Sequence, residues 1–315
     1  MLDSLHIKNF RCFEDLTIPS LGRVNLIVGK NNSGKSTLLE AVIAFAQHGR
    51  EAALLDILNK RNESYSNQLK LESIYFNGSI SPEGIFVGNK TQTLGFHFSE
   101  KRHHVFDDSL QLPDNFPQAF QNRINSHNYP FSSIDTCIKP DKDMAEIWDD
   151  IRIHKQDNLA SEALQLVDSK VENVFYTTNR ITMVSLAKER KARPIKSMGE
   201  GMSRLLQLFL HAFQARGGYL MIDEFENGLH YSIQEEVWEK LFKLAKELDI
   251  QIFATTHSRD TLEAFAKVAV ANKEVEGKLI TLGKNAGKTN RGRIISHVYN
   301  EEELEWIVNT RTEIR

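Results

Sequence analysis

The residues with the clearest chemical pattern lie near the start of the chain. Residues 29–36, G-K-N-N-S-G-K-S, fit G-x-x-x-x-G-K-[ST] without a mismatch, which disfavours a chance glycine-rich turn. In such a phosphate loop, backbone N–H groups bind phosphate oxygens at the positive end of the following helix. Lys35 reaches the β- and γ-phosphates, and the Ser36 hydroxyl ligates Mg²⁺, so the sequence predicts a nucleoside triphosphate site. The predicted binding residues are Gly29, Lys30, Asn31, Asn32, Ser33, Gly34, Lys35, Ser36 and Thr37.

Two adjacent acids follow an apolar run in the second half of the chain. Residues 219–222 read as a buried strand, and Asp223 and Glu224 come directly after it. Ligands of open α/β sheets bind at the carboxyl ends of the strands. Asp223 can therefore hold the Mg²⁺ that Ser36 also ligates, and Glu224 can orient and deprotonate the attacking water. A solvated sheet edge is the alternative explanation for this pair.

A histidine occupies the equivalent place after the next apolar strand. Residues 252–256 read as a strand, and His257 follows them. Its imidazole can hydrogen-bond the γ-phosphate or the attacking water, which predicts a catalytic role. Many single histidines have no such role, and the position after a core strand is what favours it here.

A second anion site is expected just before the acidic strand. The segment S-M-G-E-G-M combines a hydroxyl, two glycines and a helix N-terminus, with Ser197, Gly199 and Gly201 as the candidate ligands. A capped helix start explains this segment equally well. Its order along the chain favours the site.

The phosphate loop needs a strand before it and a helix after it. The run 24–28 is expected to be a strand, and the following helix should end near Gly49. Residues 5–10 and 16–18 are expected to form a front sheet with 24–28. In the second half we expect helices at 199–215, 232–248, 258–271 and 301–310, strands at 218–222 and 250–255, and a hairpin of 278–282 with 293–298.

The intervening residues are expected to be an insertion or lid. Apolar runs at 73–76, 84–87 and 93–98 are separated by turn signals, which predicts a small antiparallel meander. A helical stripe extends from Leu159 to Val171, before a strand candidate at 174–176. No heptads persist, which excludes a long coiled-coil arm.

Composition narrows the class of protein. The chain has 315 residues, of which 41% are hydrophobic and 26% charged, and its net charge is −3, so a strongly basic nucleic-acid binder is not indicated. Cys12 and Cys137 have no metal-ligand spacing and are expected to be reduced thiols. The start lacks a signal-peptide pattern, and no apolar run is long enough to cross a bilayer, which predicts a cytoplasmic protein without membrane partners.

Taken in order, the motifs resemble one protein family. G-K-N-N-S-G-K-S-T, S-M-G-E-G-M, L-M-I-D-E-F-E-N-G-L-H and F-A-T-T-H-S, with the opening I-K-N-F-R-C-F, resemble an ABC-type P-loop ATPase of the RecF/SMC/OLD branch. The resemblance is strongest to OLD-like (AAA-15/21) ATPases. It implies an α/β P-loop NTPase of the ABC-ATPase type, with a mixed, mainly parallel central sheet, an antiparallel β lobe and a helical insertion. It assigns residues 1–48 and 174–315 to the ATPase core and 49–173 to the insertion.

The resemblance also implies a head-to-tail homodimer, with higher oligomers left open. Two ATP molecules with Mg²⁺ would be sandwiched between the copies, so that Ser197, Gly199 and Gly201 of one copy contact the γ-phosphate held by the other. The segment 227–230 would cross the dimer interface. Arg11 would approach the nucleotide or DNA, and a plain surface arginine is the alternative.

The chain also departs from the family's patterns. The segment 197–201 is not L-S-G-G-Q, which disfavours a transporter, and Gln47 is the only guess for a Q-loop, with a helix-end surface residue as the alternative. OLD nucleases carry a C-terminal Toprim domain, but only 58 residues follow His257, fewer than the roughly one hundred a domain needs. The D-x-D at 141–143 is expected to be a helix start or loop. We therefore expect a separate effector protein, Toprim-like or another nuclease or toxin.

Two basic clusters could contact DNA phosphates, and a solvated surface is the alternative for both. They are Lys188, Arg190, Lys191, Arg193 and Lys196, and Lys284, Lys288, Arg291 and Arg293.

The resulting functional prediction is an ATPase that acts as a dimeric molecular switch in DNA metabolism or anti-phage defence. Binding of two ATP molecules would close the dimer, and hydrolysis would open it. The alternative is a nucleotide-gated scaffold that holds and releases an effector nuclease or toxin, with hydrolysis incidental. The two functions differ in whether release of the partner needs hydrolysis: the switch requires it, and the scaffold does not.

Overall fold

The phosphate loop is part of a six-stranded, mainly parallel sheet in the computed structural model. The structure describes residues 1–49, 51–65, 68–69, 71–78, 84–89, 93–99, 102–104, 129–136, 141–285 and 292–310. In spatial order the strands are β16 (Ile294–Val298), β15 (Gly277–Lys284), β3 (Val24–Gly29), β14 (Gln251–Thr256), β13 (Tyr219–Ile222) and β9 (Phe131–Ile134). Only the β15–β16 pair is antiparallel, and it is the expected terminal hairpin.

The central strands are buried on both faces, which explains their continuous apolar sequences. Strands β13 and β14 are buried along their whole length, as is β3 as far as Val28. Leu26 of β3 packs into one core cluster and Ile27 into another, because successive side chains point to opposite faces of a sheet. The fold class predicted from sequence is confirmed.

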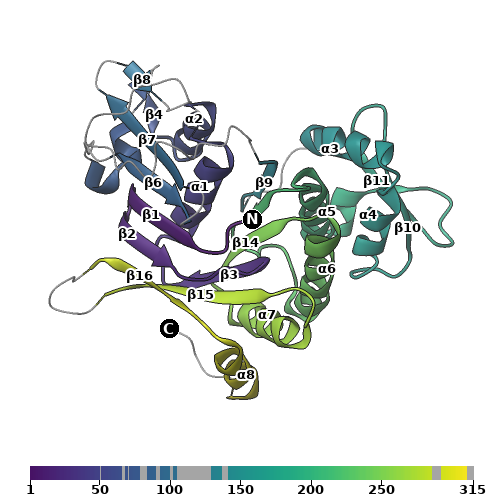
Figure 1. The fold of residues 1–315 in the computed structure, drawn as a ribbon. Coiled ribbons are helices and arrows are strands. Elements are labelled where there is room, and N and C mark those ends of the chain that lie inside the picture. The colour runs from purple at the N-terminus through teal and green to yellow at the C-terminus, as the bar shows by residue number, and fades with distance from the viewer. Residues whose placement is uncertain are drawn as a thin grey trace.

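Helices cover the two faces of this sheet. One face packs against α5 (Glu200–Gln214), α6 (Gln234–Glu247), α7 (Arg259–Ala271) and α8 (Glu301–Thr310), and the other against α1 (Lys35–Ala46). Figure 1 shows α5, α6 and α7 on the opposite side of the sheet from α1. Helix α1 ends as expected: the Gly49 N–H donates to the Ala44 carbonyl at 2.8 Å, and Gly49 has a φ of 63°.

A separate antiparallel sheet forms the β lobe. Its strands, in spatial order, are β2 (Phe13–Ile18), β1 (Leu5–Phe10), β6 (Ile85–Gly88), β7 (Thr93–Ser99) and β8 (Arg102–His104). The expected front sheet is therefore wrong in one strand, because β3 pairs with β14 and β15 and not with β1 or β2. The apolar run of β3 suits a position buried on both faces, whereas β1 alternates.

The region expected as an insertion contributes to both sheets. Strands β6 to β8 confirm an antiparallel meander, but they extend the lobe through the β1–β6 pair. The expected strand at 73–76 is wrong: 3₁₀ turns η1 (Leu71–Ile74) and η2 (Phe76–Gly78) flank a single bridge from Tyr75 to Phe10. Helix α2 (Glu51–Lys60) packs on α1, and β4 (Ser64–Tyr65) pairs with β5 (Gln68–Leu69).

Strand β9 is the larger departure, because it pairs in parallel with β13 at the edge of the central sheet. Residues 131–134 are thus a core strand supplied from within the proposed insertion 49–173, while 1–48 and 174–315 remain the proposed ATPase core. The described residues that follow β9 include α3 (Asp141–Ile153) and α4 (Asp157–Leu164), which lie beside a sheet of β10 (Val171–Tyr176), β11 (Thr182–Leu186) and β12 (Arg193–Pro194). Val171 therefore begins a strand and does not end a helix.

Candidate nucleotide-hydrolysis site

The phosphate loop connects the end of β3 to the start of α1 and closes over its own lysine. The buried Lys35 Nζ donates to the carbonyl oxygens of Gly29 at 2.8 Å and Lys30 at 3.1 Å. Burial lowers the pKa of Lys35, while the nearby carboxylates of Asp223, Glu224 and Glu226 oppose that shift. The ammonium is therefore held at the loop, where phosphate oxygens would replace its carbonyl partners.

Gly34 allows the loop to turn into α1. It has a φ of 93°, in the left-handed region, and a Cβ at this position would lie 2.7 Å from the Phe13 ring. Asn32, with a φ of 59°, makes a similar turn earlier in the loop. The loop is thus shaped by residue types that tolerate positive φ.

Ser36 and Asp223 face each other across the end of the sheet. The Ser36 hydroxyl donates to Asp223 Oδ2 at 2.9 Å, and the Thr255 hydroxyl donates to Asp223 Oδ1 at 2.5 Å. A hydroxyl and a carboxylate oxygen are ligands that Mg²⁺ accepts when phosphates and water supply the rest of its shell. Within the described residues, no group of three His, Cys, Asp or Glu side chains is placed to hold a metal ion. The pair fits the predicted Mg²⁺ site.

Glu224 begins the loop after β13 in a strained conformation. Its φ is 48°, and its N–H donates to the Thr255 hydroxyl at 2.9 Å, so the backbone turns sharply at this residue. Among the described residues, no hydrogen bond or ion pair engages its half-buried carboxylate. The carboxylate next in sequence to the predicted Mg²⁺ ligand Asp223 is therefore available to a water molecule.

His257 lies beside the phosphate loop, as the sequence predicts. A cavity of about 890 Å³ is lined by 29–33 from the loop, 256–259 after β14 and 281–284 at the end of β15. His257 is exposed, and its backbone N–H donates to Glu226 Oε1 at 2.8 Å. The structure thus brings together the phosphate loop, the two acids and the histidine.

The Ser197–Gly199 segment has no hydrogen bond to these residues within the part of the chain that the structure describes. The Ser197 hydroxyl donates to the Pro194 carbonyl at 2.7 Å within the turn η4 (Ile195–Met198), and Gly199 precedes α5 with a φ of 102°. Both residues are exposed. Gly201 instead packs internally, because a Cβ there would lie 2.9 Å from the Gly228 carbonyl.

Arg204 is a site residue that sequence reasoning missed. It comes from α5 and is 1% exposed, and its Nη1 donates to the Asp135 carbonyl at 2.6 Å. Its Nη2 donates to the carbonyls of Asp223 at 3.0 Å and Glu224 at 3.3 Å. The helix that follows the Ser197–Gly199 segment is therefore hydrogen-bonded to the backbone that presents both acids.

Arg204→Met should lower the free energy of unfolding by about 3 kcal/mol, because it leaves buried carbonyls without their donor. Urea unfolding followed by circular dichroism measures this loss. Arg216→Met is the matched control, since Arg216 donates to Gln156 at an exposed position. Equal stability of the two variants would show that Arg204 does not support the acidic loop.

Arg11 is not where the sequence predicts. Its side chain is 6% exposed and forms ion pairs with Glu40 at 2.8 Å and Glu63 at 2.9 Å, so it is neither a surface arginine nor a free nucleotide or DNA ligand. Burial raises the pKa of Glu40, and the charges of Arg11 and Arg61 oppose that shift. Arg61 also donates to the Thr37 hydroxyl at 3.2 Å, so the side chain of Thr37 faces this ionic cluster.

Asp135 is a further carboxylate at this edge of the sheet. It follows β9, whose last residue, Ile134, accepts from the Asp223 N–H at 2.9 Å. Lys60 Nζ lies 3.3 Å from Asp135 Oδ2 and balances its charge. Gln47, the guessed Q-loop residue, is the C-cap of α1 and donates to the Tyr129 carbonyl, next to the other end of β9, which supports the helix-end alternative.

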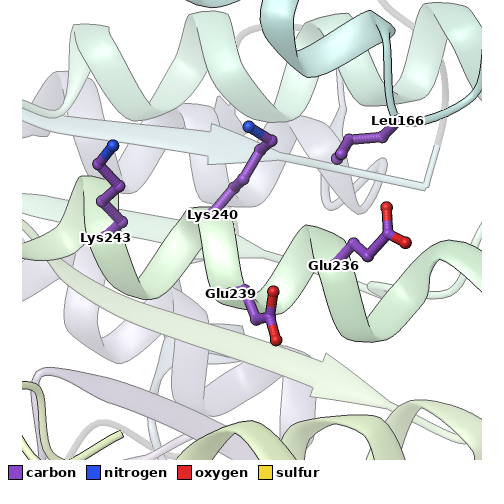
Figure 2. Close-up of a pocket in the computed structure, with 5 residues that line it drawn as sticks. All are labelled: Leu166, Glu236, Glu239, Lys240 and Lys243. Atoms are coloured by element: carbon purple, nitrogen blue, oxygen red, sulfur yellow. The ribbon is translucent and has the colours of Figure 1, made fainter. Parts of the chain in front are cut away.

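The remaining sequence candidates lie outside this site. Residues 141–143 are the start of α3, as expected for this D-x-D sequence. Cys137, Lys288 and Arg291 lie outside the described residues. A second hollow of about 430 Å³ is lined by Leu166, Glu236, Glu239, Lys240 and Lys243. Figure 2 shows Lys240 and Lys243 extending to one side of α6 and Glu239 to the other. The hollow is lined by both acidic and basic side chains, which gives it no preference for phosphate.

No helix in the described part of the chain combines the length and apolar character that a membrane span needs.

Known proteins share this architecture. The family described as AAA ATPase domain matches residues 1–186, and an AAA domain family described in connection with the AbiEii toxin of a type IV toxin–antitoxin system matches 149–263. An ATP/GTP phosphatase of Helicobacter pylori is 24% identical across 97% of this chain and 97% of its own length. An OLD nuclease of Thermus scotoductus is 52% identical over 42 residues, 13% of this chain and 8% of that protein.

The fold also resembles a solved SMC head. The SMC head bound to the C-terminal winged-helix domain of ScpA superposes with a TM-score of 0.55 at 13% identity, covering 96% of this chain and 98% of that one. At this identity the likeness concerns the fold.

Proposed function

The chain belongs to the AAA ATPase domain family, and we propose that it hydrolyses ATP to ADP and phosphate at a site shared between two copies. It is an ATPase of the AAA and ABC type, related to the RecF, SMC and OLD proteins. The observation that carries the proposed reaction is the Ser36–Asp223 hydrogen bond, followed in sequence by Glu224, whose carboxylate has no hydrogen bond or ion pair among the described residues. These three side chains match the needs of metal-assisted attack on a γ-phosphate.

In the proposed reaction each residue has a distinct task. Lys35 and the backbone N–H groups of the phosphate loop bind the phosphates, and Ser36 with Asp223 would hold Mg²⁺, which neutralises charge that develops on the γ-phosphate. Glu224 accepts a proton from the attacking water. His257 hydrogen-bonds the γ-phosphate or that water. Inorganic phosphate and ADP are the two products.

The dimer is proposed from the exposed faces of the same site. Asn227, Gly228 and His230 are exposed, and Gly228 packs against Gly201 and Arg204 near the start of α5. The proposed interface segment 227–230 therefore contacts the first turn of α5, which directly follows the Ser197–Gly199 segment. A head-to-tail arrangement would present both to the phosphate loop of a second copy.

The experiment that tests this function is phosphate release from ATP by the purified full chain, with and without Mg²⁺. We expect turnover that stops when EDTA removes Mg²⁺ and returns when Mg²⁺ is restored. Turnover that persists in EDTA, or that is absent in both conditions, would contradict the proposed reaction.

We further propose that the dimer is a switch for a separate effector, a nuclease or toxin, in DNA metabolism or anti-phage defence. Support comes from the names of the related proteins, which include an OLD nuclease and a toxin system. The alternative to this switch is a nucleotide-gated scaffold that holds and releases the effector, with hydrolysis incidental. Effector retained by ATP-bound Glu224→Gln protein, and released by the wild type, would favour the switch.

DNA is proposed as a partner of the basic segment before α5. Lys188, Arg190 and Lys191 are exposed without a salt bridge among the described residues, whereas Arg193 pairs with Glu189 at 2.7 Å. The double reversal Arg190→Glu with Lys191→Glu should abolish stimulation of turnover by DNA, because counterion release requires cations at phosphates. Lys240→Glu with Lys243→Glu on α6 is the control. Equal stimulation in both double variants would exclude this surface.

A further inference from the structure

Glu226 lies two residues after the proposed catalytic acid, and its carboxylate contacts the loop that carries His257. Its Oε1 accepts from the His257 backbone N–H at 2.8 Å, and its Oε2 accepts from the Thr256 hydroxyl at 2.7 Å. We infer that Glu226 is a positioning residue for hydrolysis, which acts by holding the His257 loop in place. This inference rests on the proposed function.

Two donors of the His257 loop reach the two oxygens of the Glu226 carboxylate. The Thr256 hydroxyl accepts from the Ser258 N–H at 2.9 Å, so its own proton is available to Glu226. Two donors therefore converge on one side chain, and only a carboxylate has an acceptor oxygen for each. Thr256 is 1% exposed, so water cannot easily replace its partner.

The arrangement separates the histidine loop from the metal ligands. Thr255, one residue earlier on β14, bonds to the Asp223 carboxylate and to the Glu224 N–H. Glu226 instead bonds to Thr256 and His257. Consecutive residues of one strand thus fix two different parts of the site, and removal of Glu226 leaves the Ser36, Asp223 and Thr255 contacts in place.

Fixing the backbone of this loop matters for the position of the His257 ring. The ring is exposed and makes no hydrogen bond to other described residues, so its position beside the phosphate loop depends on the loop backbone. A misplacement of about 1 Å can lower a rate about 100-fold. Ser258, whose hydroxyl accepts from the Thr261 N–H, is the N-cap of α7 and anchors the far end of the loop.

The test is a double-mutant cycle of Glu226→Ala and His257→Ala in the full chain, with kcat and KM for ATP measured for each variant. We expect Glu226→Ala to lower kcat about 10- to 100-fold with little change in KM. His257→Ala should lower kcat about 100-fold, and the double variant should be no slower than His257→Ala alone. Glu226→Gln, which keeps one acceptor oxygen, should lie between Glu226→Ala and the wild type.

Several outcomes would overturn the positioning role. The first is a double variant in which the kcat losses of the two single variants multiply. The second is a His257→Ala variant with wild-type kcat when Glu226→Ala is slow. The third is a rise in the KM of Glu226→Ala for ATP that accounts for its lost activity. Glu235→Ala, at an exposed position paired with Lys267, is the matched control and should keep wild-type kcat. Failure of the proposed function is separate, because the wild type itself would then show no turnover.

Discussion

Glu224→Gln is expected to lower ATP turnover about 1,000-fold while ATP remains bound. The amide cannot accept a proton from the attacking water, yet it leaves Lys35, Ser36 and Asp223 unchanged. Because hydrolysis is proposed to open the dimer, ATP-bound Glu224→Gln protein should accumulate as a dimer. Phosphate release measures the first effect, and size-exclusion chromatography with ATP measures the second.

The control for this variant is Glu239→Gln, which makes the same chemical change on the exposed side of α6. It should have wild-type turnover and no additional dimer. Normal turnover by Glu224→Gln would remove Glu224 from its role. A monomer at saturating ATP would separate the chemical step from the proposed dimer opening.

Lys35→Ala should weaken ATP binding about 100-fold, because the loop loses the charged donor that its phosphates need. The ammonium lies at hydrogen-bond distance from the Gly29 and Lys30 carbonyls, so it is already placed at the loop. Isothermal titration calorimetry measures the affinity. Thermal unfolding without nucleotide shows whether the variant remains folded.

Lys267→Ala is the matched control, because its ammonium pairs with Glu235 on the surface. It should bind ATP as the wild type does. An unchanged affinity in a folded Lys35→Ala protein would mean that phosphates do not bind at this loop.

The parts of the site that sequence reasoning identified are local in the chain. The phosphate loop is one uninterrupted segment, and its glycine positions follow from the geometry that phosphates require. Asp223 and His257 each follow a strand that contains an apolar run, and the ends of neighbouring parallel strands meet at one sheet edge. The structure brings these residues together for that reason.

The residues that sequence reasoning missed act through the backbone. Within the described residues Arg204 donates to backbone carbonyl groups, which have no pattern in the sequence, and an arginine on a helix is usually interpreted as a solvated residue. Glu226 binds an N–H and a hydroxyl on a different strand. Their partners are known only once the sheet order is known.

The errors in the predictions made from the sequence have a similar cause. Strand β9 has four residues, two of them serines, so it lacks the apolar run that predicts a buried strand. Its place is set by pairing with β13, and the Ser132 hydroxyl is satisfied by hydrogen bonds with His211 and Gln214 on α5. Arg11 was misplaced because its acidic partner Glu63 lies 52 residues away.

The central claim is that one ATP site needs two copies of the chain, and mixing two inactive variants tests it most directly. Lys35→Ala disables the phosphate loop, and Ser197→Arg blocks the exposed segment that would meet the partner's γ-phosphate. In a head-to-tail dimer of the two variants, one site combines an intact loop with an intact segment. We predict that each variant alone releases almost no phosphate and that the mixture recovers turnover. A mixture as inactive as its components would contradict the shared site.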